Sequence, residues 1–301
     1  MGFAQHQSFH IRDGWLRKGM VEVRLNEAIF TDSNQAAFQL GLGKNMAEAL
    51  RFWMWATGLT DEQPRPTDRK RVQNLTPFGQ LVLDHDPYLE EDGTLWLIHY
   101  NLISNEEGAT AWYWFFNHFA RLSFSAAEFV RELELWNIAR GAKDIALSSF
   151  EKDFDCLVRT YCAREVDTTP EDTLESPLVQ LGLLTVGGQD KDEKRYILLR
   201  PEPARVPSLV ALYVMKRWQE KNNPNSMQVS FRDMLSTPCS PGRTFLLGMR
   251  LAEAIRRIEE EEPDLRVQFT RTSGLDVLTL PRDSSTDILR MYYARVGMSV
   301  V

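Results

Sequence analysis

The stretch that decides the fold is NMAEALRFWMWATG, residues 45–58. Apolar residues recur in it at spacings of three and four, as in Met46, Leu50 and Trp53, which predicts an amphipathic helix with one face in a core. Gly58 is typical of the residue that follows a helix. We therefore expect a core helix here and build the rest of the fold around it.

The residues after this helix predict a small α/β unit. The run TDEQPRPTDRKR, residues 60–71, holds two prolines and few apolar residues, which is typical of a connector. A short helix is expected over Pro77–Asp84, with Thr76 as its N-cap. The alternating run TLWLIHYNLI, residues 94–103, predicts a strand. Helix, connector, short helix, turn and strand in this order resemble a winged-helix unit.

The remaining sequence predicts a mainly α fold with small β-ribbons. The stretch 165–177 contains five acids, no base and two prolines, which indicates a boundary between domains 1–164 and 178–301. The first domain is expected to be winged-helix-like and helical, and the second helical with a C-terminal β-hairpin; a second winged-helix-like module is one alternative for it. Helices are expected over 109–121, 125–140, 148–163, 208–221, 231–235 and 243–260, and strands over 265–270 and 274–280.

Composition excludes several classes of protein. The 301 residues include 35 Lys+Arg and 42 Asp+Glu, a formal net charge of −7, so the chain is not a histone-like polycation. With 43% hydrophobic and 26% charged residues it is globular. Its three cysteines form no CxxC pair, which argues against a zinc ribbon. The absence of a signal-like apolar segment or an 18-residue apolar run favours a cytoplasmic protein without a membrane segment.

Two basic clusters make DNA a candidate partner. In FHIRDGWLRKG, residues 9–19, Arg12 and Lys18 flank Trp15; cations neutralise phosphates and an exposed aromatic can stack on a base. A buried anchor is the alternative for Trp15. The second cluster lies in the connector, where phosphate contacts would orient a helix on a duplex; a solvated loop is its alternative. Its candidate DNA-binding residues are Arg69, Lys70 and Arg71.

The glycines before the core helix suggest a phosphate contact but no nucleotide-binding loop. A GxxxxGK[ST] motif would need glycine at position 38 and serine or threonine at position 45, where the sequence has Phe38 and Asn45. The free N–H groups of the helix start, with Lys44 beside them, can still hold one phosphate. Lys44 and Asn45 therefore join the DNA-binding candidates, with a tight helix entry as the alternative.

Carboxylates in two places could hold a metal ion. Asp86 and Glu90 lie in the acidic segment LDHDPYLEEDG, residues 83–93, and are the first candidate ligands for Mg²⁺ or another divalent metal. Asp153 and Asp155 are the second pair, with an ion pair from Asp155 to Arg159 as the structural alternative. Solvated acidic turns are the alternative for the first segment. No nuclease signature is present, so catalytic residues are not predicted.

Several longer motifs carry a resemblance to a known family. They are FHIRDGWLRKG, LGLGKNMAEALRFWMWATGL, DPYLEEDGTLWLIHYNL, ATAWYWFFNHF, ESPLVQLGLL and SPGRTFLL. Together they resemble the SspB-type proteins of bacterial single-strand DNA phosphorothioation systems, a family long labelled a domain of unknown function. The resemblance runs from Phe9 to Tyr293, and DPYLEEDGTLWLIHYNL is the most distinctive motif.

The resemblance implies a role in DNA modification and anti-phage defence. It implies nicking of DNA while sulfur replaces a non-bridging phosphate oxygen, with a cysteine desulfurase, an ATPase and an ATP-pyrophosphatase-like protein as partners. The alternative function is a non-enzymatic winged-helix adaptor that binds DNA and recruits the sulfur-transfer proteins. No nucleotide or organic cofactor is expected, and a homodimer is one alternative for the assembly state.

Overall fold

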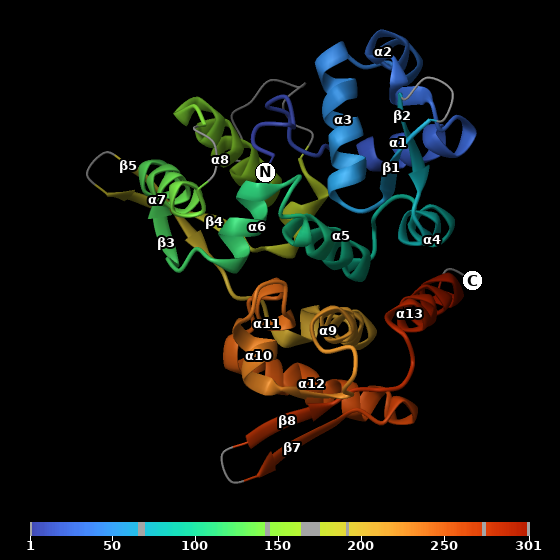
Figure 1. Ribbon diagram of the computed structural model, residues 1–301, viewed down its shortest axis with the longest axis vertical. Coiled ribbons are helices and arrows are strands. Elements are labelled where there is room, and N and C mark those ends of the chain that lie inside the picture. The colour runs from blue at the N-terminus through green and yellow to red at the C-terminus, as the bar shows by residue number, and fades with distance from the viewer. Residues whose placement is uncertain are drawn as a thin grey trace. The chain divides into compact units, whose positions relative to one another are not determined.

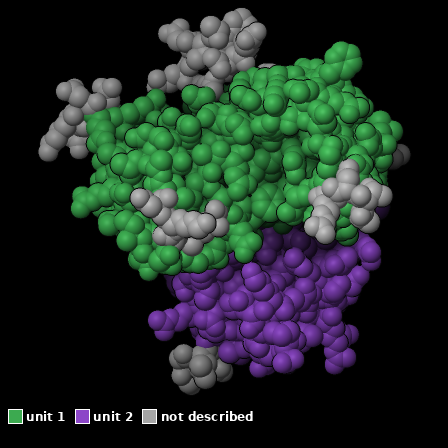
Figure 2. Space-filling model, turned by 45° about the horizontal axis from the view of Figure 1, so that its top comes forward, with its two compact units in different colours: residues 1–89, 101–199 green, residues 90–100, 200–301 purple. Residues whose placement is uncertain are grey.

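The computed structural model divides the chain into two compact units. Unit 1 comprises Met1–Leu89 and Asn101–Leu199, and unit 2 comprises Glu90–Tyr100 and Arg200–Val301 (Figures 1 and 2). The fold is mainly α-helical with small antiparallel sheets, as the sequence predicts. None of the described helices is long and apolar enough to cross a membrane. The structure describes residues 2–65, 70–141, 145–163, 175–190, 193–272 and 275–299.

The first module of unit 1 has three helices, a β-hairpin and a fourth helix. The strands pair in antiparallel register from Thr60↔Leu75 to Pro64↔Arg71. The connector expected over residues 60–71 is therefore wrong at Thr60–Pro64 and at Arg71, which form strands, and residues 66–69 lie outside the described residues. Pro64 is accommodated because it closes a strand in a two-stranded sheet, where an edge position tolerates proline. The elements are α1 (Trp15–Leu25), α2 (Ser33–Leu40), α3 (Lys44–Ala56), β1 (Thr60–Pro64), β2 (Arg71–Leu75) and α4 (Pro77–His85).

Side chains cap two helix starts in this module, and the one at Thr76 is predicted from the sequence. The Asp32 carboxylate accepts hydrogen bonds from the backbone N–H groups of Asn34 and Gln35 at the start of α2. The Thr76 hydroxyl accepts one from Gly79 at the start of α4. Such side-chain caps stabilise a helix by about 1 kcal/mol each.

The second part of unit 1 is built around a three-stranded sheet. A short strand, β3, is followed by two helices and then by a β-hairpin. In the sheet the strands lie in the order β3-β5-β4. The helices were expected from the sequence, whereas the three strands were not. The elements are α6 (Thr110–Asn117), β3 (Ser123–Ser125), α7 (Ala126–Ala139), α8 (Leu147–Tyr161), β4 (Leu184–Asp190) and β5 (Glu193–Leu198).

Unit 2 repeats this arrangement of strands. Its sheet has the order β6-β8-β7, again with the last strand in the middle. The expected C-terminal hairpin is confirmed, and the helix expected over 243–260 begins later, at Leu251. The elements are α9 (Ser208–Asn222), β6 (Gln228–Ser230), α10 (Phe231–Ser236), α11 (Pro241–Thr244), α12 (Leu251–Glu261), β7 (Gln268–Thr272), β8 (Leu275–Thr279) and α13 (Ser285–Ser299).

The strand expected over 94–103 is wrong, because these residues form helix α5 (Asp92–Ser104). Leu95, Trp96, Leu97 and Ile98 are four consecutive residues with at most 1% exposure. A helix that is buried on every side has no polar stripe, so its sequence lacks the 3.6-residue periodicity of a surface helix. The β-branched and aromatic residues of this run therefore led to the wrong prediction of a strand.

The domain boundary expected at 165–177 stays a prediction, since residues 164–174 lie outside the described residues. The two contact-defined units instead divide the chain at Leu199 and Arg200, and unit 2 also takes residues 90–100 from α5.

Candidate functional site

The start of helix α3 is an exposed, uncapped helix terminus. Gly43 is its N-cap and has an extended backbone with φ −67° and ψ 154°, and no side chain caps the first N–H groups. Lys44 and Asn45, the first two helical residues, are both exposed. This terminus therefore combines the positive end of the helix dipole with an ammonium group and an amide.

Two further candidate lysines lie around helix α2. Lys18 on α1 is exposed, and its Nζ donates a hydrogen bond to the Leu40 carbonyl over 2.9 Å. The N–H groups of Gln35 and Asn34 lower the pKa of Asp32, and the charges of Lys70 and Lys44 lower it further. The charges of Lys70 and Lys44 therefore act on the carboxylate that caps the start of α2.

Arg71, a candidate DNA-binding residue of the connector, forms an ion pair within its own hairpin. Arg71 Nε lies 3.1 Å from Glu62 Oε2, and Arg51 Nε lies 2.8 Å from Glu62 Oε1. Arg71 is nevertheless largely exposed, with 61% of its side chain accessible. Its charge is partly offset by Glu62. Arg69 lies outside the described residues.

Trp15 is buried, in agreement with its alternative interpretation as a buried anchor. Its exposed fraction is 5%, and the guanidinium of Arg12 lies over the ring at 5.5 Å from the centroid. The stacking role for Trp15 is therefore withdrawn, because the ring is neither exposed nor uncovered. Arg12 itself is only half-exposed.

The first pair of candidate metal ligands, Asp86 and Glu90, is divided between the two units. Asp86 is 4% exposed and closes α4 in unit 1, whereas Glu90 is exposed and belongs to unit 2. Within the ranges that the structure describes, no group of three or more His, Cys, Asp or Glu residues could hold a metal ion. The assignment of Asp86 and Glu90 as metal ligands therefore stays a prediction.

The second pair points in two directions. Asp153 on α8 is 1% exposed, and its Oδ1 accepts hydrogen bonds from His6 Nε2 and the Ala4 N–H, both over 2.9 Å. Asp155, two residues further along the helix, is exposed. The Asp153 carboxylate is buried and bonded to His6 and Ala4, whereas the Asp155 carboxylate faces solvent. The two carboxylates therefore do not point toward one common ion.

Sequence reasoning missed one exposed aromatic residue close to the basic candidates. Phe38 on α2 is 91% exposed. On the same helix, Ala36 and Leu40 are buried with 1% and 2% exposure. The signal was available in the sequence, because Phe38 falls outside the 36/40 spacing of the buried face.

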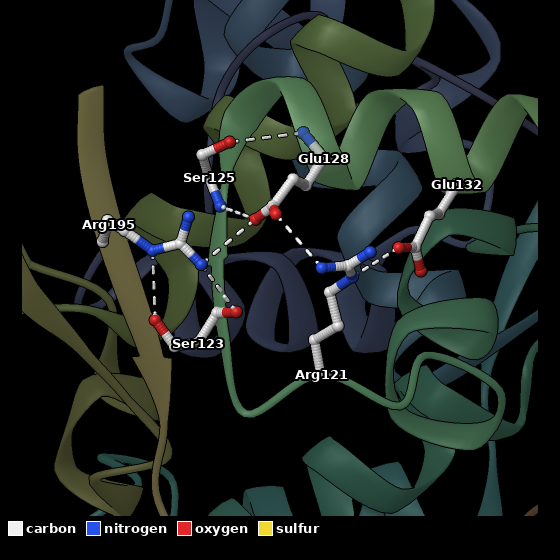
Figure 3. Close-up of polar contacts among 6 residues, drawn as sticks. All are labelled: Arg121, Ser123, Ser125, Glu128, Glu132 and Arg195. Carbon is white, nitrogen blue, oxygen red and sulfur yellow. Dashed lines mark hydrogen bonds and ion pairs between the residues drawn. The ribbon is translucent and has the colours of Figure 1, made fainter. Parts of the chain in front are cut away.

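The second part of unit 1 presents arginines that are already neutralised (Figure 3). Glu128 forms a capping box with Ser125 at the start of α7. Arg195 lies 3.2 Å from one oxygen of Glu128 and Arg121 lies 3.1 Å from the other. Arg121 also binds Glu132, and Arg195 binds Ser123. A phosphate would have to displace these carboxylates, so the network fits a structural role better than DNA contact.

A pocket in unit 2 is also lined by paired charges. Glu262, which is 6% exposed, forms a two-point ion pair with Arg295. Glu261 accepts a hydrogen bond from Ser208 Oγ over 2.6 Å and an ion pair from Arg257 at 3.1 Å. Glu91 and Asp92 of the most distinctive motif lie at the same pocket. Glu261 and Glu262 are thus already paired with Arg257 and Arg295, so these two acids do not offer an open site for a cation.

Comparison with protein families identifies the chain. The model of the family described as Protein of unknown function (DUF4007) matches residues 3–293. The chain belongs to the DUF4007 family. A comparison of this DUF4007 chain with curated protein sequences finds no match.

Two solved structures are similar to the DUF4007 chain over nearly its whole length. A crystal structure of magnesium ion-bound SspB is 28% identical, with a TM-score of 0.88, and the match covers 98% of this chain and 88% of that one. A second SspB crystal structure is 27% identical, with a TM-score of 0.87 and the same coverage. The resemblance to SspB-type proteins is thereby confirmed.

Proposed function

We propose that the chain is an SspB-type protein that nicks DNA in a bacterial phosphorothioation system. The observation that carries this proposal is the similarity to SspB over 98% of the chain at a TM-score of 0.88. The partners are then the cysteine desulfurase, ATPase and ATP-pyrophosphatase-like proteins that the family resemblance implies, and the location is the cytoplasm.

The first module of unit 1 is the proposed DNA-binding part. Three helices followed by a β-hairpin have the order of a winged-helix unit, in which the third helix enters the major groove. Here that helix is α3, which begins with Lys44 and Asn45. Lys18, Lys70 and Arg71 supply further phosphate contacts beside it. In this proposal the second part of unit 1 and unit 2 bind the partner proteins or the DNA strand that is nicked.

Replacing Lys44 and Lys70 together by glutamate should weaken binding to duplex DNA and flatten its dependence on salt. Each lost phosphate contact reduces the slope of log affinity against log salt by about 0.9. A fluorescence anisotropy titration at several salt concentrations measures both effects. The matched control is Lys152→Glu, which changes an exposed lysine on α8. Equal slopes for the double variant and the wild type would remove these lysines from the DNA surface.

Nicking itself is tested with purified protein on supercoiled plasmid, with and without Mg²⁺. The expected product is the open circular form, and its absence with every divalent metal would contradict the nicking proposal. The magnesium in one SspB structure is a reason to include the metal. The candidate carboxylate ligands stay a prediction, and we assign no step of the reaction to a metal.

The second candidate function is the DNA-binding adaptor. The observation that favours it is the lack, among the described residues, of a cluster of three or more side chains able to bind a metal. An adaptor would bind DNA with the same salt dependence and would leave the plasmid supercoiled, so the two assays together separate the candidates.

A further inference from the structure

Phe38 is the most exposed large apolar side chain that the structure describes. It is 91% exposed and lies in the last turn of α2, on the side away from the buried Ala36 and Leu40. Single exposed apolar residues are common on proteins, so the exposure alone assigns no role. The surroundings of Phe38 decide what it can bind.

The polar surroundings argue against a hydrophobic docking patch. Asn34, Gln35 and Gln39 on the same helix are all exposed. A protein interface has an apolar core with several large side chains, and the exposed surface of α2 offers one. An isolated aromatic ring among amides matches the flat face and polar edges of a nucleobase.

The charges near Phe38 complement a nucleic-acid strand. The Lys18 ammonium is fixed at the end of α2 by its 2.9 Å bond to the Leu40 carbonyl, two residues after Phe38. Gly41 ends α2 in the left-handed region with φ 63° and Gly43 begins α3, so Lys44 follows at once. Phe38, the Lys18 ammonium and Lys44 therefore all lie at the end of α2 and the turn that leads into α3.

Three acids in this region are engaged by the protein's own donors. Asp32 caps α2, and Glu22 accepts a hydrogen bond from Gln39 over 2.9 Å. Glu62 is paired with Arg51 and Arg71. These bonds hold the carboxylates at fixed positions and leave the ammonium groups of Lys18 and Lys44 exposed to a polyanion.

We propose that Phe38 stacks on an unpaired base of DNA whose phosphates contact Lys18 and Lys44. A ring can stack only on a base face that the duplex does not cover. The first module would therefore bind a duplex with an unpaired base more tightly than an intact duplex, which deepens the DNA-binding proposal above and rests on it.

The test compares three probes of one sequence in the full-length protein. They are an intact duplex, the same duplex with one unpaired 2-aminopurine, and the single strand. Affinity is measured by anisotropy, and stacking by the quenching of 2-aminopurine fluorescence. The variants are Phe38→Ala, Phe38→Trp and the control Tyr88→Ala, since Tyr88 is 61% exposed but its ring already lies 4.6 Å from the guanidinium of Arg17.

Phe38→Ala should weaken binding to the unpaired probe by about tenfold, the lower part of the range for one stacked base. It should abolish the quenching and leave intact-duplex affinity unchanged, while Phe38→Trp should keep both preference and quenching. Tyr88→Ala should behave as wild type.

Three results would overturn the stacking proposal while leaving DNA binding intact. The first is wild-type affinity and quenching in Phe38→Ala, and the second is an equal loss of affinity for all three probes in that variant. The third is a loss of self-association of Phe38→Ala in sedimentation with an unchanged preference among the DNA probes. If the wild type bound none of the probes, the DNA-binding function would fail together with it.

Discussion

The imidazole of His6 carries its proton on Nε2. Its Nδ1 accepts a hydrogen bond from the backbone N–H of Ser8 over 3.1 Å, and a backbone N–H can only donate. Nε2 is then the donor to Asp153 Oδ1. The ring is 0% exposed and lies 6.1 Å from Trp53 in a stacked arrangement. This pair ties the N-terminal segment to α8.

Replacing His6 by alanine should destabilise unit 1 by about 3 kcal/mol, because it leaves a buried carboxylate with too few donors. Asp153 Oδ2 already lacks a hydrogen-bond partner among the described atoms. Urea denaturation measures the change. Asp155→Asn, an exposed acid on the same helix, should change stability by less than about 0.5 kcal/mol. Equal effects of the two variants would contradict the structural role of the pair.

The acid stability of unit 2 should depend on Ser208. The hydrogen bond from Ser208 lowers the pKa of Glu261, and Arg257 lowers it further. A lowered pKa contributes stability above the unfolded value near 4.5, and that stability is lost as pH falls through the lower folded pKa. Ser208→Ala should therefore lose less stability between pH 7 and pH 3 than the wild type. Thermal denaturation at both pH values tests this, and a larger loss in the variant would contradict it.

Individual residues could be predicted only where local chemistry decides their environment. The exposure of Lys44 and Asn45 follows from a glycine-flanked helix start. The burial of Trp15 does not, because Phe9 and Arg12 cover it through the path of the chain before α1. The partner of Asp153 is 147 residues away in sequence, so spacing along α8 could not reveal it.

At the scale of elements, helix α7 shows how a local signal fixes a boundary. Ser125 accepts from the Glu128 N–H, and Glu128 accepts from the Ser125 N–H. The motif is readable from sequence as a serine followed three residues later by glutamate. Arg121 and Arg195 then bind the same glutamate from the loop before β3 and from β5.

Ser125→Ala should destabilise unit 1 by about 1 kcal/mol, the usual cost of losing an N-cap side chain. Ser148→Ala is the matched control, since Ser148 is an exposed serine in the first turn of α8. The control should stay within about 0.5 kcal/mol of wild type. Chemical denaturation of both variants measures the difference, and similar values would show that the cap contributes little.

The strands were the elements that sequence patterns located least well. β3 and β6 each have three residues, too few for an alternating pattern to stand out. The β1–β2 hairpin has a mostly exposed first strand and carries prolines and charges, so it reads as a loop. Pairing with a neighbour, rather than intrinsic preference, makes these residues strands.

At the scale of the molecule, unit 2 is discontinuous in sequence. Its first piece is residues 90–100. There Trp96 packs edge-on against Phe245 at 5.4 Å and donates to the Arg205 carbonyl, and His99 binds the Thr244 carbonyl. Burial lowers the pKa of His99 to about 3, so its imidazole is neutral inside unit 2 at neutral pH.

A fragment that ends at Leu199 should therefore be poorly soluble although it contains all of unit 1. It would carry residues 90–100 without the rest of unit 2 and would expose Trp96. Co-expression with residues 200–301 should restore solubility, as measured by the soluble fraction and by Trp fluorescence. A soluble, monomeric fragment alone with blue-shifted emission would contradict this account of the units.

The split of unit 2 also sets an order of events during synthesis. Residues 101–199 separate its two pieces, and ribosomes add about 5–20 residues per second. The apolar half of α5 therefore leaves the ribosome about 5–20 s before the first of its own partners exists. During that interval the rest of unit 1, residues 101–199, is synthesised, and the waiting segment becomes a natural target for chaperones that bind short hydrophobic stretches.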